Sequence, residues 1–534
     1  MFSGACRARE LILAHIFVAA SPASAGGPPE MTSSRPVHAP PAAASGLEAD
    51  PDVKARLLAA TTRPSSAGFG AKYAARIDGT LFVGFVALLA WTPLWFGSNL
   101  PLAWGVNAVG FGGLAVLYEI GLLATLRRHP VAPRRIWFPA LAFAGVCAWS
   151  LIQVSSFVPT GNQHPIWQMA RETLASDLPG SISVNRDDTI VALLRFVTCG
   201  LAFWLALQLC RQAARARRLT QAIAIIGGFY ATYGVIAFFL FPRTLLWFDK
   251  AAYLDSVTSS FVNRNSYATY AGLGLTATLA VAASLFLHRG GLQSAGVGRE
   301  IARFIALIVG PLGLWIACAS IVGAALILTG SRGGCFATLG GLLTFLLVAG
   351  VRGRDNAAAT GFGLLMVGLA IGAAVFNFGD FLADRLTAQG LASNDRLAVY
   401  GLTWRSIADA PLLGFGDGTF QEIFPMYRDN TIDLLGVWDK AHNSYLELLQ
   451  GLGVPVALLF LAAIALLAGR CVFAALTRRN SVTAPLAASA ATVIVALHAF
   501  VDFSMQIEAV ALTWVALLGA GVAQSWSSKI ATDR

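Results

Sequence analysis

Long apolar segments alternate with short polar ones from Thr80 to the end of the chain. A helix needs about 20 residues to cross a hydrocarbon core about 30 Å thick, and the apolar segments are close to that length or exceed it. The pattern therefore predicts an all-α polytopic membrane protein. We expect about twelve transmembrane helices, near residues 80–98, 102–126, 136–156, 189–210, 219–241, 264–287, 304–329, 335–351, 357–378, 443–468, 482–503 and 507–526.

One polar segment, residues 379–442, is much longer than the other interruptions after the N-terminal tail. It is rich in Arg, Asp, Trp and Tyr, and we expect a large outer loop that contains short helices. The predicted parts of the chain are a disordered cytoplasmic tail (1–75), N-terminal transmembrane helices (76–260), transmembrane helices with a Ser-Arg-Gly-Gly hairpin (261–378), the large loop (379–442) and C-terminal transmembrane helices (443–534).

Composition and charge support the same class. Only 12% of the residues are charged, whereas a soluble domain has about 25%. The net charge of +10 could indicate nucleic-acid binding, but the arginines lie in short clusters between apolar segments. Each cluster follows an even-numbered span, and basic residues concentrate in cytoplasmic loops. We therefore expect both termini in the cytoplasm, the large loop outside and no nucleic-acid partner.

The N-terminal tail has a short apolar run at residues 11–20, preceded by Arg7 and Arg9, which resembles a signal peptide. Cleavage and export of this tail would place Lys72 and Arg76 outside and invert the later loops against the charge rule. We therefore expect a disordered cytoplasmic tail, which starts at Met1 or Met31.

Ser331 and Arg332 lie in a glycine-rich turn between two apolar segments, at their outer ends. An arginine costs roughly 2.5–3.5 kcal/mol at the centre of a membrane helix and less near the interface. Arg332 is therefore either a phosphate-binding guanidinium, which matches phosphate bidentately, or an interfacial anchor at a tight turn.

The large loop contains a predicted helix that begins at Asn394 or Asp395 and runs to about residue 410. Arg396 lies in its first turn, where free N–H groups favour an anion; the alternative is an ion pair with a neighbouring carboxylate. An apolar stripe on this helix is typical of one that lies on a membrane surface, and it consists of Leu397, Tyr400, Trp404 and Ile407. The glycines at 414, 416 and 418 either expose amides to a phosphate or turn the chain.

His442 ends the large loop, and a helix is expected to carry His442 and Tyr445 on one face, with Asn443 on another polar stripe. Such a polar helix would line the bundle interior or a wet cavity. A neutral imidazole there can act as a general base; the alternative is a histidine bonded to a loop carbonyl. His498 and Asp502 are spaced to pair with each other or with a site arginine, and Asn263 begins the sixth span at the same face.

Together these motifs resemble the O-antigen ligase and O-antigen polymerase superfamily. The motifs that carry the resemblance are Ser331, Arg332 and Gly333 at a hairpin, Arg396, Trp404 and 411–416 in one loop, then 442–446 and Asp502, with a weaker element at Phe261, Asn263 and Asn265. Each motif is loose alone, but their order and shared face make the combination specific. The resemblance covers residues 260–510.

The resemblance implies a membrane glycosyltransferase of the GT-C type in the bacterial inner membrane, with a periplasmic active site. It would transfer a glycan from an undecaprenyl-pyrophosphate carrier to lipid A core (a ligase) or to another lipid-linked repeat unit (a polymerase), with inversion and without a metal or other cofactor. Arg332 and Arg396 would bind the pyrophosphate and His442 would activate the acceptor hydroxyl. The implied substrate-binding residues are Ser331, Arg385, Asn443, Tyr445, Asn263 and Asp502.

Two other functions fit a polytopic protein. A flippase or exporter of lipid-linked glycans should carry charged residues along a path through the bilayer, whereas the charges here concentrate at one face. A transporter of soluble substrates often has internal repeats, and we find none in this sequence. Both comparisons favour the transferase.

Overall fold

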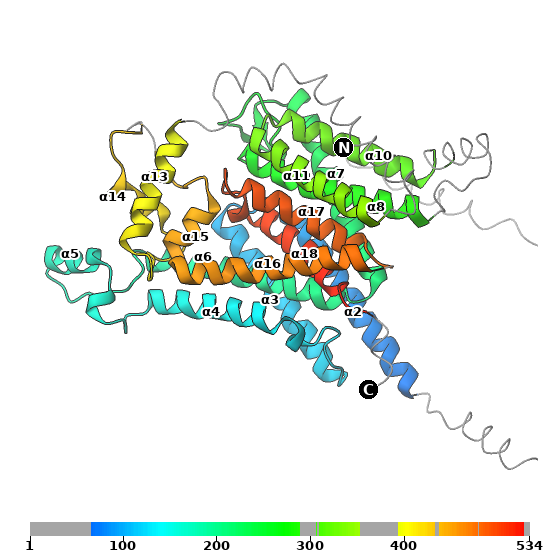
Figure 1. Cartoon of the computed structure of the whole chain (residues 1–534), viewed down its shortest axis with the longest axis horizontal. Helices are drawn as coiled ribbons and strands as arrows, with labels where there is room; N and C mark the ends of the chain where they lie inside the picture. Colours follow the sequence, from blue (N-terminus) through cyan, green and yellow to red (C-terminus); the bar gives the residue numbers. More distant parts are fainter. Residues whose placement is uncertain are drawn as a thin grey trace, which may run out of the picture. The chain divides into compact units, whose positions relative to one another are not determined.

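The computed structural model describes residues 66–288, 306, 309–352, 394–432, 437–478 and 480–527. Most of these residues are helical and very few are in strands, which confirms the all-α class for them (Figure 1). The helices before residue 289 are α2 (Ser66–Trp91), α3 (Pro101–Ala124), η1 (Pro133–Ile136), α4 (Trp137–Val154), η2 (Thr160–Asn162), α5 (Pro165–Leu174), α6 (Arg186–Leu209), α7 (Ala213–Leu240) and α8 (Arg264–His288). One short antiparallel hairpin pairs β1 (Thr244–Leu245) with β2 (Phe248–Asp249).

The later helices divide into membrane-length helices and shorter ones. The former group is α10 (Pro311–Leu328), α11 (Arg332–Arg352) and α16 (Val454–Thr477), followed by the slightly shorter α17 (Thr483–His498) and α18 (Glu508–Ala523). The short helices are α13 (Asn394–Asp409), α14 (Phe420–Tyr427), α15 (Ser444–Leu452) and η3 (Ser504–Gln506).

Within the described ranges, nine helices are long and apolar enough to cross a membrane. They and the shorter pair α17 and α18 fall where eleven of the predicted spans lie; the span predicted at 357–378 is outside the described residues. Helix α2 starts at Ser66, earlier than the predicted end of the tail at 75. Alanines make this stretch a good helix former, so the helix extends beyond its apolar part.

The span predicted at 443–468 is wrong, because the chain breaks at Gly453. Helix α15 ends at Leu452, and α16 begins at Val454. Gly453 has φ of +78°, and a Cβ there would lie 2.4 Å from the carbonyl oxygen of Leu412. The site-bearing helix α15 is therefore separate from the membrane-length helix α16.

The span predicted at 482–503 is too long, because α17 ends at His498. The chain then turns back, with Val501 N–H bonded to the His498 carbonyl at 3.0 Å. Apolar residues continue through this turn, so hydropathy alone did not show where the helix ends. Asp502 therefore lies in a connecting loop.

Helix α18 occupies the centre of the bundle, and all of its residues are buried. It packs against α6, α17, α16, α8 and α7. Small residues allow close helix approach: a Cβ at Gly519 would lie 2.7 Å from the Phe203 carbonyl oxygen, and one at Gly521 would lie 2.5 Å from Ala488 Cβ.

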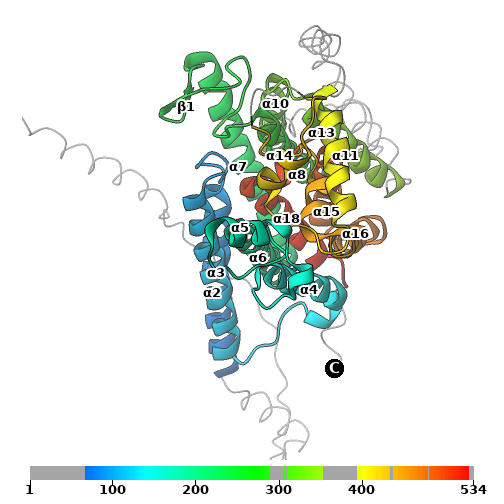
Figure 2. The same ribbon diagram turned by 90° about the vertical axis from the view of Figure 1, so that its left-hand side faces the viewer.

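The polar and basic parts of the bundle gather at opposite ends. At one end Arg127 pairs with Asp78 at 3.0 Å, and Arg211 and Arg478 both bond to the Trp526 carbonyl, at 3.1 and 2.8 Å. Helices α6 and α18 run from that end to the other, where α5, α13, α14 and α15 lie (Figure 1). Figure 2 views the molecule from this second end. Residues from three of the predicted basic clusters, Arg127, Arg211 and Arg478, thus lie at one end of the bundle.

Candidate functional site

His442 lies in the segment that leads into α15 and is not on the helix, so the prediction that it shares a helix face with Tyr445 is wrong. Its backbone is left-handed, with φ of +54°, and α15 begins at Ser444. Asn443 caps the helix, because its Oδ1 accepts two first-turn N–H groups at 3.1 Å. The His442 carbonyl accepts the Tyr400 hydroxyl at 3.0 Å.

The His442 ring faces Asp502, with Nδ1 3.5 Å from Oδ1. This distance is longer than a hydrogen bond, and Nδ1 has no hydrogen-bond partner among the described residues. Phe503 and Trp438 flank the ring, with centroids at 5.0 and 5.8 Å. The His442 side chain is 20% exposed, so one part of the ring is fixed against the protein while another is open to a ligand.

Asp502 is fully buried and well supplied with donors. The Ser504 hydroxyl donates to its Oδ2 at 2.5 Å, and Asn265 Nδ2 donates to Oδ1 at 3.4 Å. Burial opposes the charge of this carboxylate, but its contacts with His442, His498 and Ser504 outweigh burial and hold its pKa below the ordinary 3.8. Asp502 is therefore a charged partner for His442 at neutral pH.

His498 joins the same cluster through Ser504 and has no direct hydrogen bond to Asp502 among the described contacts. Its Nδ1 lies 3.1 Å from the Ser504 hydroxyl and 2.6 Å from the Thr269 hydroxyl. A Cβ on Gly333 would lie 3.1 Å from the other ring nitrogen, Nε2. The start of α11, where Arg332 is the first residue, therefore packs against the end of α17.

Arg396 lies in the first turn of α13, as predicted, and its Nη1 donates to the Val501 carbonyl at 3.3 Å. Asp502 follows Val501, so Arg396 lies beside the Asp502 loop. Arg332 is half-buried at the start of α11, and Gly333 contacts Val501. Arg396 thus contacts the loop that carries the partner of His442, and the backbone next to Arg332 packs against the same loop.

Of the apolar stripe predicted on α13, Ile407 is buried, and contact of the exposed members with a membrane surface stays a prediction. Leu397 and Trp404 are 57% and 58% exposed, whereas the buried face follows Val399 and Leu402 and continues through two polar residues, Thr403 and Ser406. The hydroxyls of these two residues bond to carbonyls of α13 itself, which permits burial. This face packs against α14 and the segment before α15.

Four predicted substrate-binding residues have structural contacts. Ser331 Oγ accepts the Gly334 N–H at 3.2 Å, and Asn263 Oδ1 accepts the Asn265 N–H at 2.7 Å, so each caps a helix start. Asn443 caps α15 as described. The Tyr445 hydroxyl donates to the Ala496 carbonyl at 2.8 Å. Arg385 is outside the described residues.

The glycine motif at 414–418 turns and packs the chain. Gly414, Gly416 and Gly418 all have positive φ. The Gly416 N–H donates to the Gly451 carbonyl at 3.0 Å, and a Cβ at Gly414 would lie 2.4 Å from that same oxygen. The Gly414 N–H donates to Ala410. Two of the amides that could have bound a phosphate are therefore used within the protein.

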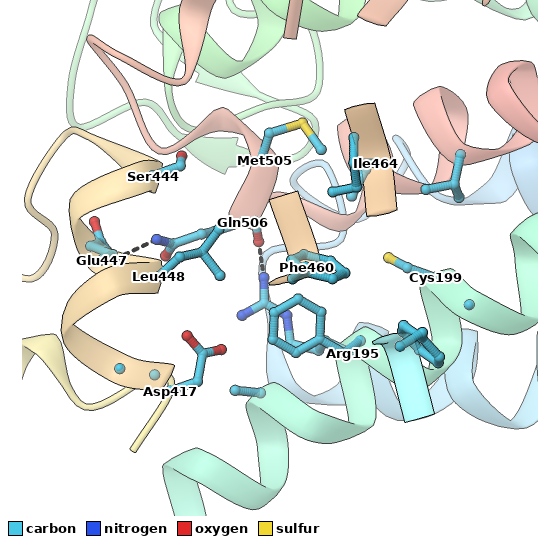
Figure 3. Close-up of a pocket in the computed structure, with 18 of the residues that line it drawn as sticks. Arg195, Cys199, Asp417, Ser444, Glu447, Leu448, Phe460, Ile464, Met505 and Gln506 are labelled. Atoms are coloured by element: carbon cyan, nitrogen blue, oxygen red, sulfur yellow. Dashed lines mark hydrogen bonds between the residues drawn. The ribbon is translucent and has the colours of Figure 1, made fainter. Parts of the chain in front are cut away.

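A cavity of about 670 Å³ borders α15, and its lining includes none of His442, Arg332, Arg396 and Asp502. Arg195, Asp417 and Glu447 lie at one end of it (Figure 3); apolar residues of α4, α6, α16 and α18 line the rest. Burial raises the pKa of Asp417 to about 6, although Arg195 and Lys440 oppose the rise. Sequence reasoning missed this cavity, because its walls come from helices far apart in the chain.

Sequence reasoning also missed Ser504 and Thr269, which bond to the ring of His498. Serine and threonine are common in such helices, so no local signal marks them. The described residues contain no group of three His, Cys, Asp or Glu side chains that could hold a metal ion.

Residues 317–461 match the family model described as O-antigen ligase. This match confirms the predicted resemblance for that part of the chain and supports a glycosyltransferase-like function in polysaccharide assembly. Arg332, Arg396 and His442 lie inside the matched segment, and Asp502 lies outside it. No curated protein was found to match the chain.

Proposed function

We propose that the protein transfers a glycan from an undecaprenyl-pyrophosphate carrier to an acceptor sugar at the periplasmic face of the bacterial inner membrane. The observation that carries this proposal is the pairing of His442 with buried Asp502, next to the loop approached by Arg396 and the start of α11. The O-antigen ligase match supports the proposal, because the matched segment contains Arg332, Arg396 and His442. The acceptor is lipid A core for a ligase and a lipid-linked repeat unit for a polymerase.

The contact with Asp502 supports a proposed role for each ring nitrogen of His442. Because Nδ1 faces a carboxylate, Nδ1 carries the proton and Nε2 is free to accept one. In the proposed reaction Nε2 takes the proton of the acceptor hydroxyl, whose oxygen forms a bond to the anomeric carbon of the donor. The bond from that carbon to the pyrophosphate oxygen breaks, with inversion. Asp502 stabilises the imidazolium that results.

Arg332 and Arg396 are proposed to neutralise the leaving pyrophosphate. Guanidinium groups form charge-assisted, often bidentate hydrogen bonds with phosphate. They would supply the electrostatic stabilisation that a metal ion provides in other transferases. We therefore propose a metal-independent transfer, with Arg385 as a further candidate for the same role.

A lipid-linked glycan flippase or exporter is the alternative. Arg195 of α6 is the observation in favour of this alternative, because an arginine within a membrane-length helix often marks a polar path. However, Arg195 lies 3.8 Å from Glu508 at the start of α18 and bonds to the Gln506 carbonyl. These contacts fix it near the site end of the bundle and favour transfer.

The test uses purified protein in proteoliposomes with EDTA present. The donor is an undecaprenyl-pyrophosphate-linked oligosaccharide, and the acceptors, in separate reactions, are lipid A core and a second lipid-linked unit. The wild-type protein is expected to transfer glycan to one of them. His442→Ala and Arg332→Ala are each expected to lower transfer by at least about 10²-fold, because one removes the base and the other removes charge stabilisation.

Met426→Ala is the control, since this exposed side chain of α14 belongs to none of the predicted motifs, and it should transfer at the wild-type rate. His442→Ala that transfers normally would contradict the base assignment. Transfer that appears only when Mg²⁺ replaces EDTA would contradict the metal-independent mechanism. Movement of the donor across the membrane without transfer would favour the flippase.

A further inference from the structure

Glu447 connects two separate segments of the site through its two carboxylate oxygens. Its side chain is buried within α15. Oε1 accepts the backbone N–H of Ala441 at 2.8 Å, and Oε2 accepts the side-chain amide of Gln506. Figure 3 shows the contact with Gln506, whose carbonyl is in turn bonded by Arg195.

Each of these two segments carries one member of the histidine–aspartate pair. Ala441 directly precedes His442, whose left-handed backbone costs about 1–2 kcal/mol for a residue other than glycine. Gln506 ends η3, the short helix that follows Asp502. Ser444 ties the start of α15 to the Asp502 loop, since its hydroxyl donates to the Asp502 carbonyl at 3.0 Å and its N–H to the Ala499 carbonyl at 2.8 Å. Ala441 and His442 have no backbone hydrogen bond to η3 within the described residues, so on the other side of His442 the carboxylate of Glu447 is a second bridge.

We infer that Glu447 is a positioning residue, whose carboxylate holds the segments of His442 and Asp502 at the separation at which the two side chains pair. This inference rests on the proposed function for its catalytic meaning. Both groups bonded to Glu447 are N–H donors. A carboxylate is suited to this position, because it offers only acceptors and can receive both at once.

The same chemistry distinguishes two substitutions. Glu447→Ala removes both links. Glu447→Gln keeps an oxygen for the Ala441 N–H, and its NH₂ group can donate to Gln506 once the Gln506 amide rotates to present its oxygen. Glutamine should therefore restore the geometry that alanine loses.

Gln153 offers a matched control on α4. It is also a buried side chain that bridges two segments, since its Nε2 donates to the Leu413 carbonyl at 2.7 Å and to the Gly451 carbonyl at 2.8 Å. Gly451 is near the end of α15 that is distant from His442, and the N–H groups of Phe415 and Gly416 hold the same end of the helix. Neither bond of Gln153 is to the segment of His442 or that of Asp502. Gln153→Ala should lower thermal stability as Glu447→Ala does, without disturbing the pair.

The first measurement is transfer by proteoliposomes with the donor and acceptors named above. For Glu447→Ala we expect kcat to fall by about 10²-fold with KM changed less than threefold or so, because misplacing a catalytic group by about 1 Å has an effect of that size. Glu447→Gln should recover kcat to within about tenfold of the wild type. Gln153→Ala, normalised to folded protein, should keep the wild-type kcat.

The second measurement does not require activity. Diethyl pyrocarbonate modifies accessible histidine rings, and mass spectrometry of the peptide that contains His442 gives its rate. The wild-type ring is only 20% exposed, so Glu447→Ala should accelerate modification severalfold, while Glu447→Gln and Gln153→Ala should not.

The inference would be overturned if diethyl pyrocarbonate modified His442 in Glu447→Ala at the wild-type rate. It would also be overturned if Glu447→Ala and Gln153→Ala lost kcat equally. If the wild-type protein transfers no glycan but Glu447→Ala still exposes His442, the positioning role stands and the proposed function fails.

Discussion

At the scale of single residues, the site depends on a carboxylate, that of Asp502, whose two oxygens both accept hydrogen bonds. Asp502 receives hydrogen bonds from Ser504 and Asn265, so its carboxylate cannot rotate freely towards or away from His442. A fixed acceptor beside Nδ1 selects one tautomer of the imidazole. The orientation of the histidine therefore depends on residues that need not touch a substrate.

Asp502→Asn is expected to lower transfer by about 10–10²-fold, because the amide cannot stabilise an imidazolium as a carboxylate does. It should also reduce the free energy of unfolding by about 1–3 kcal/mol. Since the folded-state pKa of Asp502 is lowered, its stabilising effect is complete above the ordinary pKa of 3.8 and is lost as the pH falls below it.

The measurement is the difference in melting temperature between the wild type and Asp502→Asn across pH. It should be constant in the neutral range and shrink only below about pH 4. A difference that already disappears at mildly acidic pH would mean that Asp502 is not charged in the way its contacts indicate.

The residues of the site were predictable from the sequence to different degrees. His442 and Arg396 stand out because polar residues are rare in this chain, and the structure places both near the 501–502 loop. The position of His442 off the helix was missed, although Asn443 directly before an apolar run is a helix-start signal. The contact between His442 and Asp502 is long-range, and no local pattern encodes it.

At the scale of elements, the break at Gly453 sets the direction of α15 independently of α16. The tight approach of Gly453 to Leu412, with the bond from Val454 N–H to the Pro411 carbonyl at 2.8 Å, locks this junction against the chain that follows α13. The helix that carries Arg396 and the helix that follows His442 are therefore held together at this junction. Gly453 and Pro455 together indicate a break in the helix. The prediction missed the break because the residues on both sides of it are apolar.

Gly453→Ala is expected to lower the free energy of unfolding by about 2 kcal/mol or more, because a Cβ is strained at this φ and meets backbone. Transfer should fall with it, since α15 shifts. Gly469→Ala is the matched control: it lies in the middle of α16, and a Cβ there has no atom within 4 Å. That substitution should be neutral or stabilise by up to about 1 kcal/mol. Thermal unfolding in detergent measures both; equal melting temperatures would refute the strain at Gly453.

At the scale of the whole molecule, the bundle has a basic end and an end that carries the candidate site. The approximate places of the described apolar helices followed from hydropathy because a bilayer fixes helix length. Hydropathy did not predict which helix lies at the centre of the bundle, because α18 and the outer helices are similarly apolar. The charge rule assigns the basic end to the cytoplasm, and this orientation is a prediction.

Cysteine labelling tests the orientation in cells that express variants without native cysteines. Asn162→Cys, exposed near α5, should react with a membrane-impermeant maleimide in intact spheroplasts. Arg128→Cys, exposed at the basic end, should react only after the membrane is permeabilised. The reverse pattern would place the candidate site in the cytoplasm and exclude a periplasmic transfer.

The complete enclosure of α18 has a consequence for biosynthesis. Ribosomes release helices in order, so the helix that fills the centre of this bundle is made after all the described helices that surround it. The final packing of those earlier helices therefore requires α18 to be made and inserted. Helix α18 carries Glu508 at its start, which bonds to Asn107 of α3 at 2.6 Å, so its arrival also joins the first half of the chain to the last.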